Sequence, residues 1–302
     1  MTAWIDAFLP TFGLIALGSI LRARVLTDAA VWRGLETLTF WVLLPALLAH
    51  SISRVELSTL PLASLGTVLW LTLLLATASA IGISRLFGHD RAAMTSIVQG
   101  GIRFNTYTAL GISAGLYGEE GLALGGVVGG LVVTGAQTIL AVVFVVSDGR
   151  RVSPLRILVQ VVSNPLLLGC LVGFAFAAAG GMPPGIGPLA RSLGQASLAL
   201  GLLCVGAGLS LASLREAPAT QVAITVQKLV AVPAVTLALA WAFGLEGQAA
   251  SVAVLVMAMP TATTAYVMAR ALGGDARLMA ATITLQHLAA LVTLPAWAAL
   301  LR

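Results

Sequence analysis

The sequence predicts an all-α integral membrane protein with ten transmembrane helices in two inverted five-helix repeats, and three observations support this prediction. Of the 302 residues, 59% are apolar and only 9% are charged, whereas about a quarter of an average soluble domain is charged. The apolar residues form ten long runs, and the chain matches itself at an offset of 156 residues. This composition excludes a soluble enzyme, a disordered chain and a secreted disulfide scaffold.

Each of the ten apolar segments is long enough to cross a bilayer as a helix, at about 20 residues per span. They are expected to be helices because lipid leaves every backbone N–H group in need of a partner within the chain. The first is interpreted as a retained helix, since no basic region precedes it and no small-residue cleavage site follows. The predicted spans are residues 3–21, 35–52, 60–84, 92–116, 122–146, 157–179, 186–211, 220–243, 248–272 and 278–301.

The basic residues between the spans predict the orientation, because cytoplasmic loops carry an excess of Lys and Arg. With the N-terminus outside, eleven arginines fall on the cytoplasmic side and only Arg54, Arg191 and Arg302 fall outside. Both termini are therefore expected on the periplasmic side of the plasma (inner) membrane. The basic residues are scattered singly between apolar runs, so the net charge of +5 predicts no nucleic-acid partner.

The internal repeat is a gapless match between the two halves of the chain. Phe87-Gly88 matches Phe243-Gly244, and Thr108-Ala109 matches Thr264-Ala265. Each half holds five spans, an odd number, so the second half is expected to insert upside down, as in many secondary transporters. The predicted domains are a first repeat at 1–146, a cytoplasmic linker at 147–156 and a second, inverted repeat at 157–302.

Spans 4 and 9 each contain an interruption, and the two coincide under the repeat. Span 4 carries Gly100-Gly101 shortly before Asn105, and span 9 carries Pro260, which removes an N–H group and clashes with the preceding turn. In inverted-repeat carriers, substrate binds where such helices are broken near the bilayer midplane. Two half-helix N-termini there would offer partial positive charge to an anion, although each break could also be a packing kink.

Several polar residues near these breaks are candidates for function. Arg103 could clamp a carboxylate through two parallel hydrogen bonds, or tie helix carbonyls together. Lys228, the only lysine, could attract an anion, neutralise helix C-terminal carbonyls, titrate during transport, or snorkel towards the cytoplasm. His50 and His287 are candidate proton carriers for coupling, or are satisfied by their neighbours. The candidate substrate-binding residues are Asn105, Arg103, Thr106, Pro260, Thr261, Thr264, Lys228 and Gln137.

The residue types and motifs that the predicted spans lack also narrow the range of possible functions. All eleven acidic residues lie at or near predicted span ends, so no carboxylate pair is expected in mid-membrane. This disfavours an antiporter built on buried aspartates, and the buried positive residues favour an anionic substrate. No phosphate-binding loop, zinc-protease motif or serine-hydrolase context occurs, so we expect no enzyme, no metal and no cofactor. Coupling to a proton or sodium gradient stays open.

Four short motifs follow one another along the chain. They are Leu44-Pro-Ala-Leu-Leu-Ala-His50, Arg103-Phe-Asn-Thr106, Gln227-Lys-Leu-Val-Ala-Val-Pro233, and Ala258-Met-Pro-Thr-Ala262 with Gly273-Gly-Asp275. Their order and spacing resemble the auxin efflux carrier family, which includes bacterial malonate and malate carriers, and the similarity covers essentially the whole chain. The long cytoplasmic loop of plant members is absent, which favours a compact bacterial type.

The resemblance implies ten helices with spans 4 and 9 broken and crossing. It also implies a scaffold of spans 1, 2, 6 and 7 that forms a homodimer, and a transport unit of spans 3–5 and 8–10 that moves against it like an elevator. Asn105 falls on the family's crossover asparagine and Pro260 on a crossover proline, while His50 and Lys228 fall on positions that the family uses in spans 2 and 8. Span 3 lacks the aspartate of plant members, which puts a proton-linked role there in doubt.

The function predicted from these features is secondary active transport of a small organic anion, a mono- or dicarboxylate, by alternating access. The alternative is a sodium- or proton-coupled carrier of the related bile-acid or cation/proton type, which needs a buried carboxylate near the crossover. A third interpretation, a sensor or an intramembrane enzyme, lacks an output domain and a catalytic set of residues.

Overall fold

The computed structural model describes residues 2–56, 60–148, 159 and 162–301, and every regular element among these residues is a helix. The predicted linker at 147–156 therefore lies almost wholly outside the described residues, as does Arg302. Contacts divide the chain into two compact units, each assembled from three separate stretches of sequence. Unit 1 is Met1–Pro61, Thr106–Gly130 and Gln160–Gly208, and unit 2 is Leu62–Asn105, Leu131–Val159 and Leu209–Arg302.

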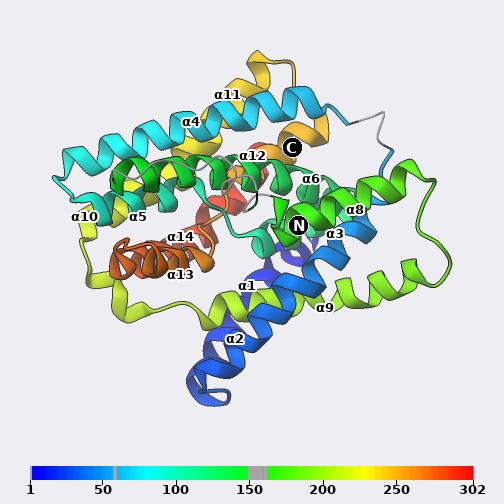
Figure 1. Cartoon of the computed structure of the whole chain (residues 1–302), viewed down its shortest axis with the longest axis horizontal. Coiled ribbons are helices and arrows are strands. Elements are labelled where there is room, and N and C mark those ends of the chain that lie inside the picture. Colours follow the sequence, from blue (N-terminus) through cyan, green and yellow to red (C-terminus); the bar gives the residue numbers. More distant parts are fainter. Residues whose placement is uncertain (1, 57–59, 149–158, 160–161, 302) are drawn as a thin grey trace. The chain divides into compact units, whose positions relative to one another are not determined.

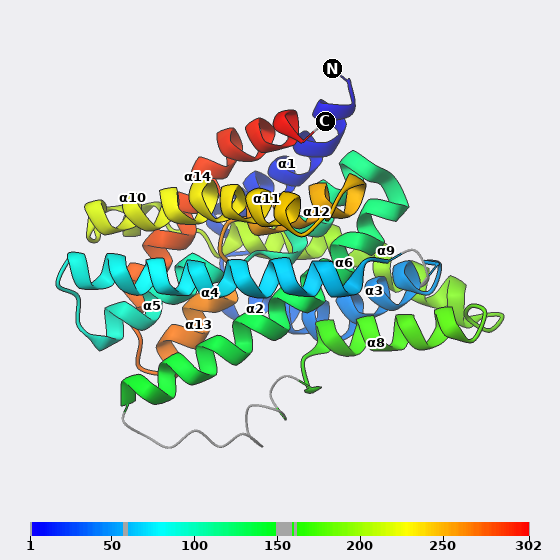
Figure 2. The same cartoon turned by 90° about the horizontal axis from the view of Figure 1, so that it is seen from above.

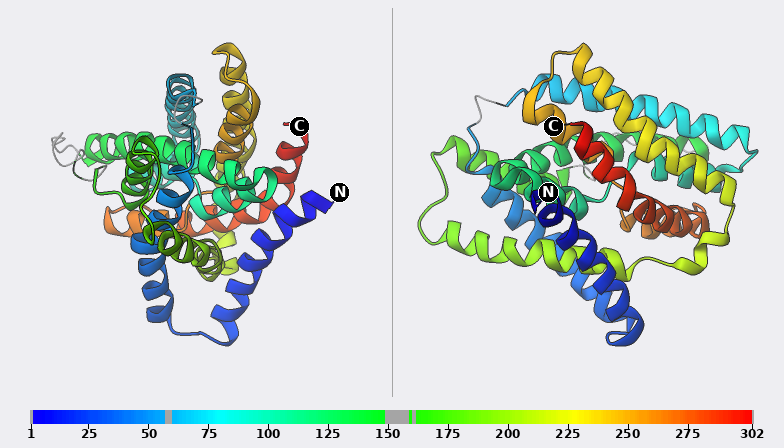
Figure 3. Two further views of the ribbon diagram at one scale, coloured as in Figure 1. Left: turned by 90° about the vertical axis from the view of Figure 1, so that its right-hand side faces the viewer. Right: turned by 180° about the vertical axis from the view of Figure 1, so that it is seen from behind.

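Unit 1 is built by packing long apolar helices closely against one another. α1 and α2 splay into a V (Figure 3), and α1 packs along α9. Small residues permit the close approach: a Cβ added at Gly206 of α9 would lie only 1.8 Å from the carbonyl oxygen of Ile15 in α1. The elements are α1 (Thr2–Arg24), α2 (Ala29–Leu38), the π-helical turn η1 (Thr39–Leu43), α3 (Leu44–Ile52), α8 (Pro165–Ala178), α9 (Ile186–Ala207), and α6 (Thr106–Asp148) as far as Gly130.

Unit 2 is organised around α12 and the two residues that follow it, since every side chain from Val252 to Met259 is fully buried. Around this core, α4 runs alongside α10 and α11 (Figures 1 and 2), and α4 also packs on α5. The elements are α4 (Leu62–Leu86), α5 (Arg91–Ile102), α6 from Leu131, the 3-10 turn η3 (Leu211–Arg215), α10 (Pro218–Val226), the π-helical turn η4 (Gln227–Ala231), α11 (Val232–Ala242), α12 (Gly247–Met257), α13 (Thr264–Ala271) and α14 (Ala276–Leu300).

Seven helical segments of the described chain are long and apolar enough to cross a membrane, which agrees with a multi-pass membrane protein. One of them, Arg91–Val146, covers both the fourth and the fifth predicted spans. Two apolar helices are shorter, Pro165–Ala178 and Gly247–Met257, and they cover parts of the sixth and ninth predicted spans. The count of ten spans and the opposite insertion of the two halves remain predictions.

Helix boundaries recur at the offset of 156 residues. Adding 156 to the bounds of α4, 62 and 86, gives 218 and 242, which are the bounds of the segment Pro218–Ala242. Gly88, just after α4, has φ +68°, and Gly244, just after α11, has φ +63°. A left-handed conformation of this kind favours glycine, because other residues meet a steric penalty there. The repeated Phe-Gly pair is therefore the turn that ends both helices.

One predicted boundary was wrong. The second span was expected to begin at residue 35, but the helix begins at Ala29, because the Asp28 side chain accepts a hydrogen bond from the Ala30 N–H at 2.7 Å and caps it. Glu36, which was expected at the edge of a span, therefore lies inside the helical segment Ala29–Ile52. The cap was overlooked because Asp28 stands well before the apolar run.

Candidate functional site

The predicted interruption of the fourth span lies at residues 103–105. α5 ends at Ile102, Arg103 is extended with φ −76° and ψ 157°, and α6 begins at Thr106. In an uninterrupted helix the Phe104 N–H would donate to the Gly100 carbonyl. Since the chain leaves the helix first, this carbonyl needs another donor.

The predicted interruption of the ninth span is present as well, between α12 and α13. α12 ends at Met257 and α13 begins at Thr264. The helix tightens before it stops, because the Met259 N–H donates to the Val256 carbonyl at 3.2 Å, a bond across three residues. Pro260 follows and has no N–H to continue the ladder, and the chain then leaves the helix, so the Met257 carbonyl at this helix end loses its backbone donor.

The two interruptions meet within unit 2 through backbone and side-chain hydrogen bonds. The Asn105 N–H donates to the Pro260 carbonyl at 2.7 Å. The Thr261 hydroxyl donates to the Gly100 carbonyl at 2.8 Å, and the Gln286 Nε2 donates to the same carbonyl at 3.0 Å. The Gln286 Oε1 in turn accepts from the Thr261 N–H at 2.8 Å. The buried Gln286 side chain of α14 therefore donates to a carbonyl at one interruption and accepts from an N–H group at the other.

The Asn105 side chain is also held by α14. Its Nδ2 lies 3.3 Å from Nε2 of His287, and Nδ1 of His287 lies 2.8 Å from the Ile283 carbonyl. A carbonyl only accepts, so Nδ1 carries the proton, and Nε2 of the neutral ring accepts from the Asn105 amide. Asn105 and His287 are only 2% and 3% exposed. The orientation of the buried amide is thus coupled to the protonation state of one histidine.

Arg103 lies at the end of α5 and is partly buried. Its Nη2 donates to the Thr264 hydroxyl at 2.9 Å, while Nη1 lies 3.3 Å from Sδ of Met268 and 3.5 Å from Oε1 of Gln99. All these partners are neutral, and no carboxylate within the described part of the chain forms an ion pair with Arg103. Nε2 of Gln99 is buried and has no hydrogen-bond partner there either. The guanidinium therefore has hydrogen bonds but no opposite charge beside it among the described residues.

Lys228 occupies a different environment. It is 0% exposed, and its Nζ donates to the carbonyl of Met257, the last residue of α12, at 2.8 Å. Helix C-termini carry partial negative charge, so the ammonium group neutralises the end of α12. Of the roles predicted for this residue, neutralisation of helix carbonyls is the one observed, and the fully buried side chain does not snorkel. The π-helical turn η4, which contains Lys228, turns the side chain towards α12.

The structure brings most of the predicted residues together, but not all of them. Thr106 is the first residue of α6 and belongs to unit 1. Gln137 lies farther along α6 and is partly buried, without a hydrogen bond to the residues of the interruptions. His50 belongs to unit 1. The residues in contact at the interruptions are Arg103, Asn105, Pro260, Thr261, Thr264 and His287, with Lys228 at the end of α12.

Some residues that contact the interruptions could hardly be identified from the sequence. Gln286 and Met268 contact the interruptions, and only their polarity or their position in an apolar helix could have marked them. The Gly100 carbonyl, a backbone acceptor for two side chains, has no signal beyond the glycine pair. Asn164, another polar residue of an apolar segment, caps α8 by accepting from the Leu166 N–H at 2.9 Å.

Comparison with known families supports a transporter. Residues 150–298 match the family model described as "Membrane transport protein", which is the auxin efflux carrier type of family. The match covers slightly less than half of the chain and includes the two motifs around Lys228 and Pro260, whereas those around His50 and Arg103 precede it. No curated protein matches the chain. The second half of this chain is thus similar to membrane transport proteins.

Proposed function

We propose that the protein is a secondary active transporter of a small organic anion, a mono- or dicarboxylate, and that the two interruptions of unit 2 form its binding site. The observation that carries this proposal is the Arg103 guanidinium, whose partners at the interruptions are all neutral among the residues that the structure describes. A charge removed from water costs free energy unless an opposite charge or a set of hydrogen bonds compensates it. A carboxylate bound to Arg103 would supply that compensation, in a geometry with two parallel hydrogen bonds.

The N-terminus of α13 adds to the same attraction. Arg103 donates to the hydroxyl of Thr264, the first residue of α13, so an anion on the guanidinium would also lie near the N-terminus of this helix. Helix N-termini carry partial positive charge and bind anions. The buried Asn105 amide, in turn, offers hydrogen-bonding atoms at the same interruption. These groups together favour a carboxylate over a cation.

His287 gives the proposed site a route for proton coupling. When the ring takes up a proton at Nε2, that atom changes from an acceptor into a donor, and it can no longer accept from the Asn105 amide. The amide must then turn to another partner. A sodium site of the related bile-acid or cation/proton type would need buried carboxylates, and none of the described side chains classed as buried is Asp or Glu.

The remaining elements of the proposal follow from the resemblance to auxin efflux carriers. Spans 3–5 and 8–10 would move as a transport unit against a scaffold of spans 1, 2, 6 and 7, with alternating access by an elevator-like motion. The scaffold would form a homodimer. The protein would lie in the plasma (inner) membrane with both termini on the periplasmic side, as the distribution of arginines predicts.

The experiment is uptake of radiolabelled malonate by proteoliposomes that contain the wild type, Arg103→Ala or Asn105→Ala. Hydrogen bonds to charged groups contribute about 1.5–3 kcal/mol, so we expect uptake at low substrate to fall by roughly tenfold to a hundredfold for Arg103→Ala. Arg33→Gln on the exposed face of α2 is the control and should transport as the wild type does. Unchanged transport in both site variants would remove the assignment.

A further inference from the structure

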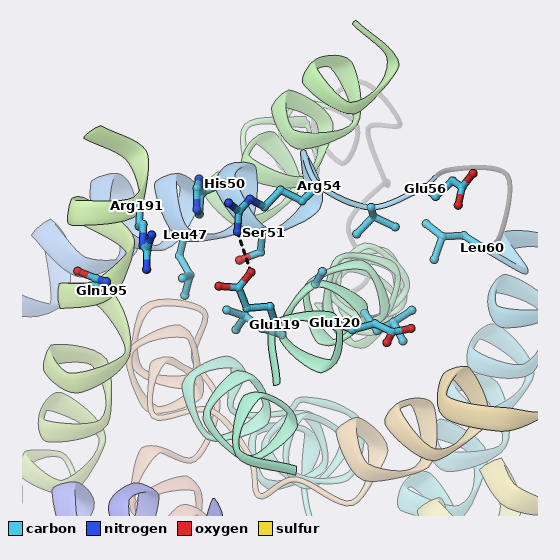
Figure 4. A pocket seen from close by; sticks show the side chains of 14 residues that line it. Leu47, His50, Ser51, Arg54, Glu56, Leu60, Glu119, Glu120, Arg191 and Gln195 are labelled. Atoms are coloured by element: carbon cyan, nitrogen blue, oxygen red, sulfur yellow. Dashed lines mark hydrogen bonds and ion pairs between the residues drawn. The ribbon is translucent and has the colours of Figure 1, made fainter. Parts of the chain in front are cut away.

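A cavity of about 600 Å³ lies within unit 1 and includes no residue of the helix interruptions. It is formed by the end of α3 and the segment after it, by α6 just beyond its kink at Gly118, and by the N-terminal part of α9. Figure 4 shows charged side chains from all three of these elements around the cavity. The polar residues that line it are His50, Ser51, Arg54, Glu56, Glu119, Glu120, Arg191 and Gln195.

Three of these residues, His50, Arg54 and Arg191, form what we name the basic wall. All three also line a second cavity of unit 1, of about 360 Å³. They lie next to one another in Figure 4, and the charges of both arginines act on the His50 ring. Two neighbouring cavities of one unit therefore share a single cluster of basic side chains.

The basic wall has unused capacity to bind an anion. Nη1 of Arg54 donates to Oε2 of Glu119 at 2.7 Å, but the two side chains are 55% and 77% exposed. Ion pairs that exposed are weak and exchange readily. Arg191 has no carboxylate within ion-pair distance among the residues that the structure describes. Nδ1 of His50 is buried and has no hydrogen-bond partner in the same part of the chain.

Glu119 partly offsets the basic wall through its bond to Arg54 and its charge near His50, but the other acidic residues of the cavity lie away from it. In Figure 4, Glu56 and Glu120 lie at the opposite end from His50 and Arg191, and the Arg54–Glu119 pair lies between the two ends. The cavity is therefore basic at one end and acidic at the other. A ligand that carries an oxyanion group would be drawn to the end lined by Arg191.

The charge pattern of the sequence supports a role for these arginines. Outer loops are poor in Arg and Lys by the rule that predicts the orientation, and only three arginines are expected outside. Two of the three, Arg54 and Arg191, converge on this one cavity. Scattered surface charges would not be expected to gather from two separate segments, 137 positions apart (191 minus 54), around one hollow.

We propose that the basic wall is a second binding site, for the carboxylate or phosphate group of a small solute or a lipid headgroup. Arg191 and His50 would hold the oxyanion first, and Arg54 would exchange its bond to Glu119 for one to the ligand. A guanidinium matches both oxygens of a carboxylate or phosphate, which suits this exchange. This inference does not depend on the proposed function, because every residue involved belongs to unit 1.

The test measures binding of succinate by calorimetry to the purified full-length chain in phosphatidylcholine nanodiscs. All variants carry Arg103→Gln, so that the interruptions of unit 2 do not contribute. We expect the Arg103→Gln chain to bind succinate still, and the addition of Arg191→Gln to weaken binding by about tenfold, as expected for loss of a charged hydrogen bond. The addition of Arg33→Gln, another arginine of unit 1 that lines neither cavity, should leave binding unchanged.

A gain of affinity separates the proposal from simple misfolding. Glu119→Gln frees Arg54 from its ion pair, so succinate should bind a few-fold more tightly to the Arg103→Gln/Glu119→Gln chain. Weaker or unchanged binding would overturn the proposed exchange. The site itself is refuted if the Arg103→Gln chain binds no succinate, or if Arg191→Gln and Arg33→Gln have equal effects.

The same chains distinguish the two sources of the oxyanion. If nanodiscs that contain phosphatidylglycerol weaken succinate binding to the Arg103→Gln chain but not further in the Arg191→Gln background, a lipid headgroup competes for the basic wall. If lipid composition has no effect, the site takes a solute. Failure of the proposed function would appear separately, as absent malonate uptake in liposomes while this succinate binding persists.

Discussion

The two interruptions of unit 2 meet the same physical need with different chemistry. A helix that stops among buried residues leaves its last carbonyl groups without donors. At the first interruption the Gly100 carbonyl accepts from neutral groups, the Thr261 hydroxyl and the Gln286 amide. At the second interruption the Met257 carbonyl accepts from the Lys228 ammonium. The repeat has conserved the break in the helix but not the means of satisfying it.

This difference separates the two cations. Lys228 is fully buried and its charge is used at the end of α12. Arg103 lies beyond the end of α5, where its guanidinium touches a hydroxyl, a thioether and an amide and retains donor capacity. Sequence alone left both residues as candidate anion ligands or structural groups. These contacts favour a structural role for Lys228, and we propose that Arg103 is the one of the two that binds the ligand.

The substitutions Arg103→Met and Lys228→Met test the different roles of the two cations, and the largest effect is expected here. Arg103→Met should reduce malonate uptake by roughly tenfold or more with little change in melting temperature, because the guanidinium is the proposed ligand. Lys228→Met should lower the stability by about 1–3 kcal/mol, because the Met257 carbonyl loses its donor. Uptake in proteoliposomes and thermal melting would be measured for both variants.

The opposite pattern would contradict the comparison. If Lys228→Met melts as the wild type does but fails to transport, the ammonium serves the substrate and its bond to Met257 is incidental. If Arg103→Met is destabilised without a loss of uptake by the folded fraction, the guanidinium is a structural tie. Arg33→Gln controls for the loss of an arginine as such.

The next effect concerns His287, which serves only the first interruption. His287→Gln keeps an amide oxygen that can accept from Asn105 but cannot carry a proton. We expect uptake driven by an imposed pH gradient to fall to the level seen without the gradient, while exchange of malonate at equal pH continues. His89→Gln is the matched control, since His89 bonds to the Thr220 hydroxyl at 2.7 Å and takes no part in the interruptions. A full response to the gradient in His287→Gln would exclude coupling through this ring.

Much of unit 2 could be predicted from the sequence, because the relevant signals are local. Apolar runs predict helices, and Pro260 and the glycines before Asn105 predict where two of them break. The offset of 156 residues also predicts that the two breaks correspond to one another. Arg103 and Thr264 are both candidates on sequence alone, since polar groups in an apolar span are uncommon and functional.

The partners of these residues could not be predicted, for a physical reason. A hydrogen bond between α5 and α14 depends on how two helices rotate about their axes, and no single sequence fixes that rotation. Gln286 is therefore only one more polar residue until it is seen between Gly100 and Thr261. Every residue has the same backbone carbonyl, so the sequence does not show which carbonyls accept hydrogen bonds from Gln286 and Lys228.

A smaller effect is expected at Gly101, whose equivalent at the second interruption is Met257 (101 plus 156 gives 257). A Cβ at Gly101 would lie 2.8 Å from Oε1 of Gln227 and 3.2 Å from Cβ of Ala80. A side chain at the first interruption must therefore displace the Gln227 amide and press on Ala80, whereas the second interruption buries a methionine. Gly101→Ala should destabilise the protein by about 1–3 kcal/mol in thermal melting, the cost typical of overpacking.

The control for this substitution is Gly82→Ala on α4. Nothing lies within 4 Å of a Cβ at Gly82, which is exposed, so alanine there should be neutral or stabilise the helix by up to about 1 kcal/mol. Equal melting temperatures for the two variants would mean that α5 can shift away from α4 and η4 without cost. The tight fit of Gly101 at the first interruption would then not be required for stability.

The smallest effect is expected at Trp297, whose side chain contacts η4, the turn that contains Lys228. Pro233 has no N–H to donate to the Leu229 carbonyl, and Nε1 of Trp297 donates to it instead at 2.8 Å. Trp297→Phe should cost about 1 kcal/mol, the usual contribution of one hydrogen bond. In a Pro233→Ala background the cost should be smaller, because the restored N–H of residue 233 can serve the same carbonyl. A double-mutant cycle in thermal melting measures this coupling, and strictly additive effects would show that the indole supports η4 by packing alone.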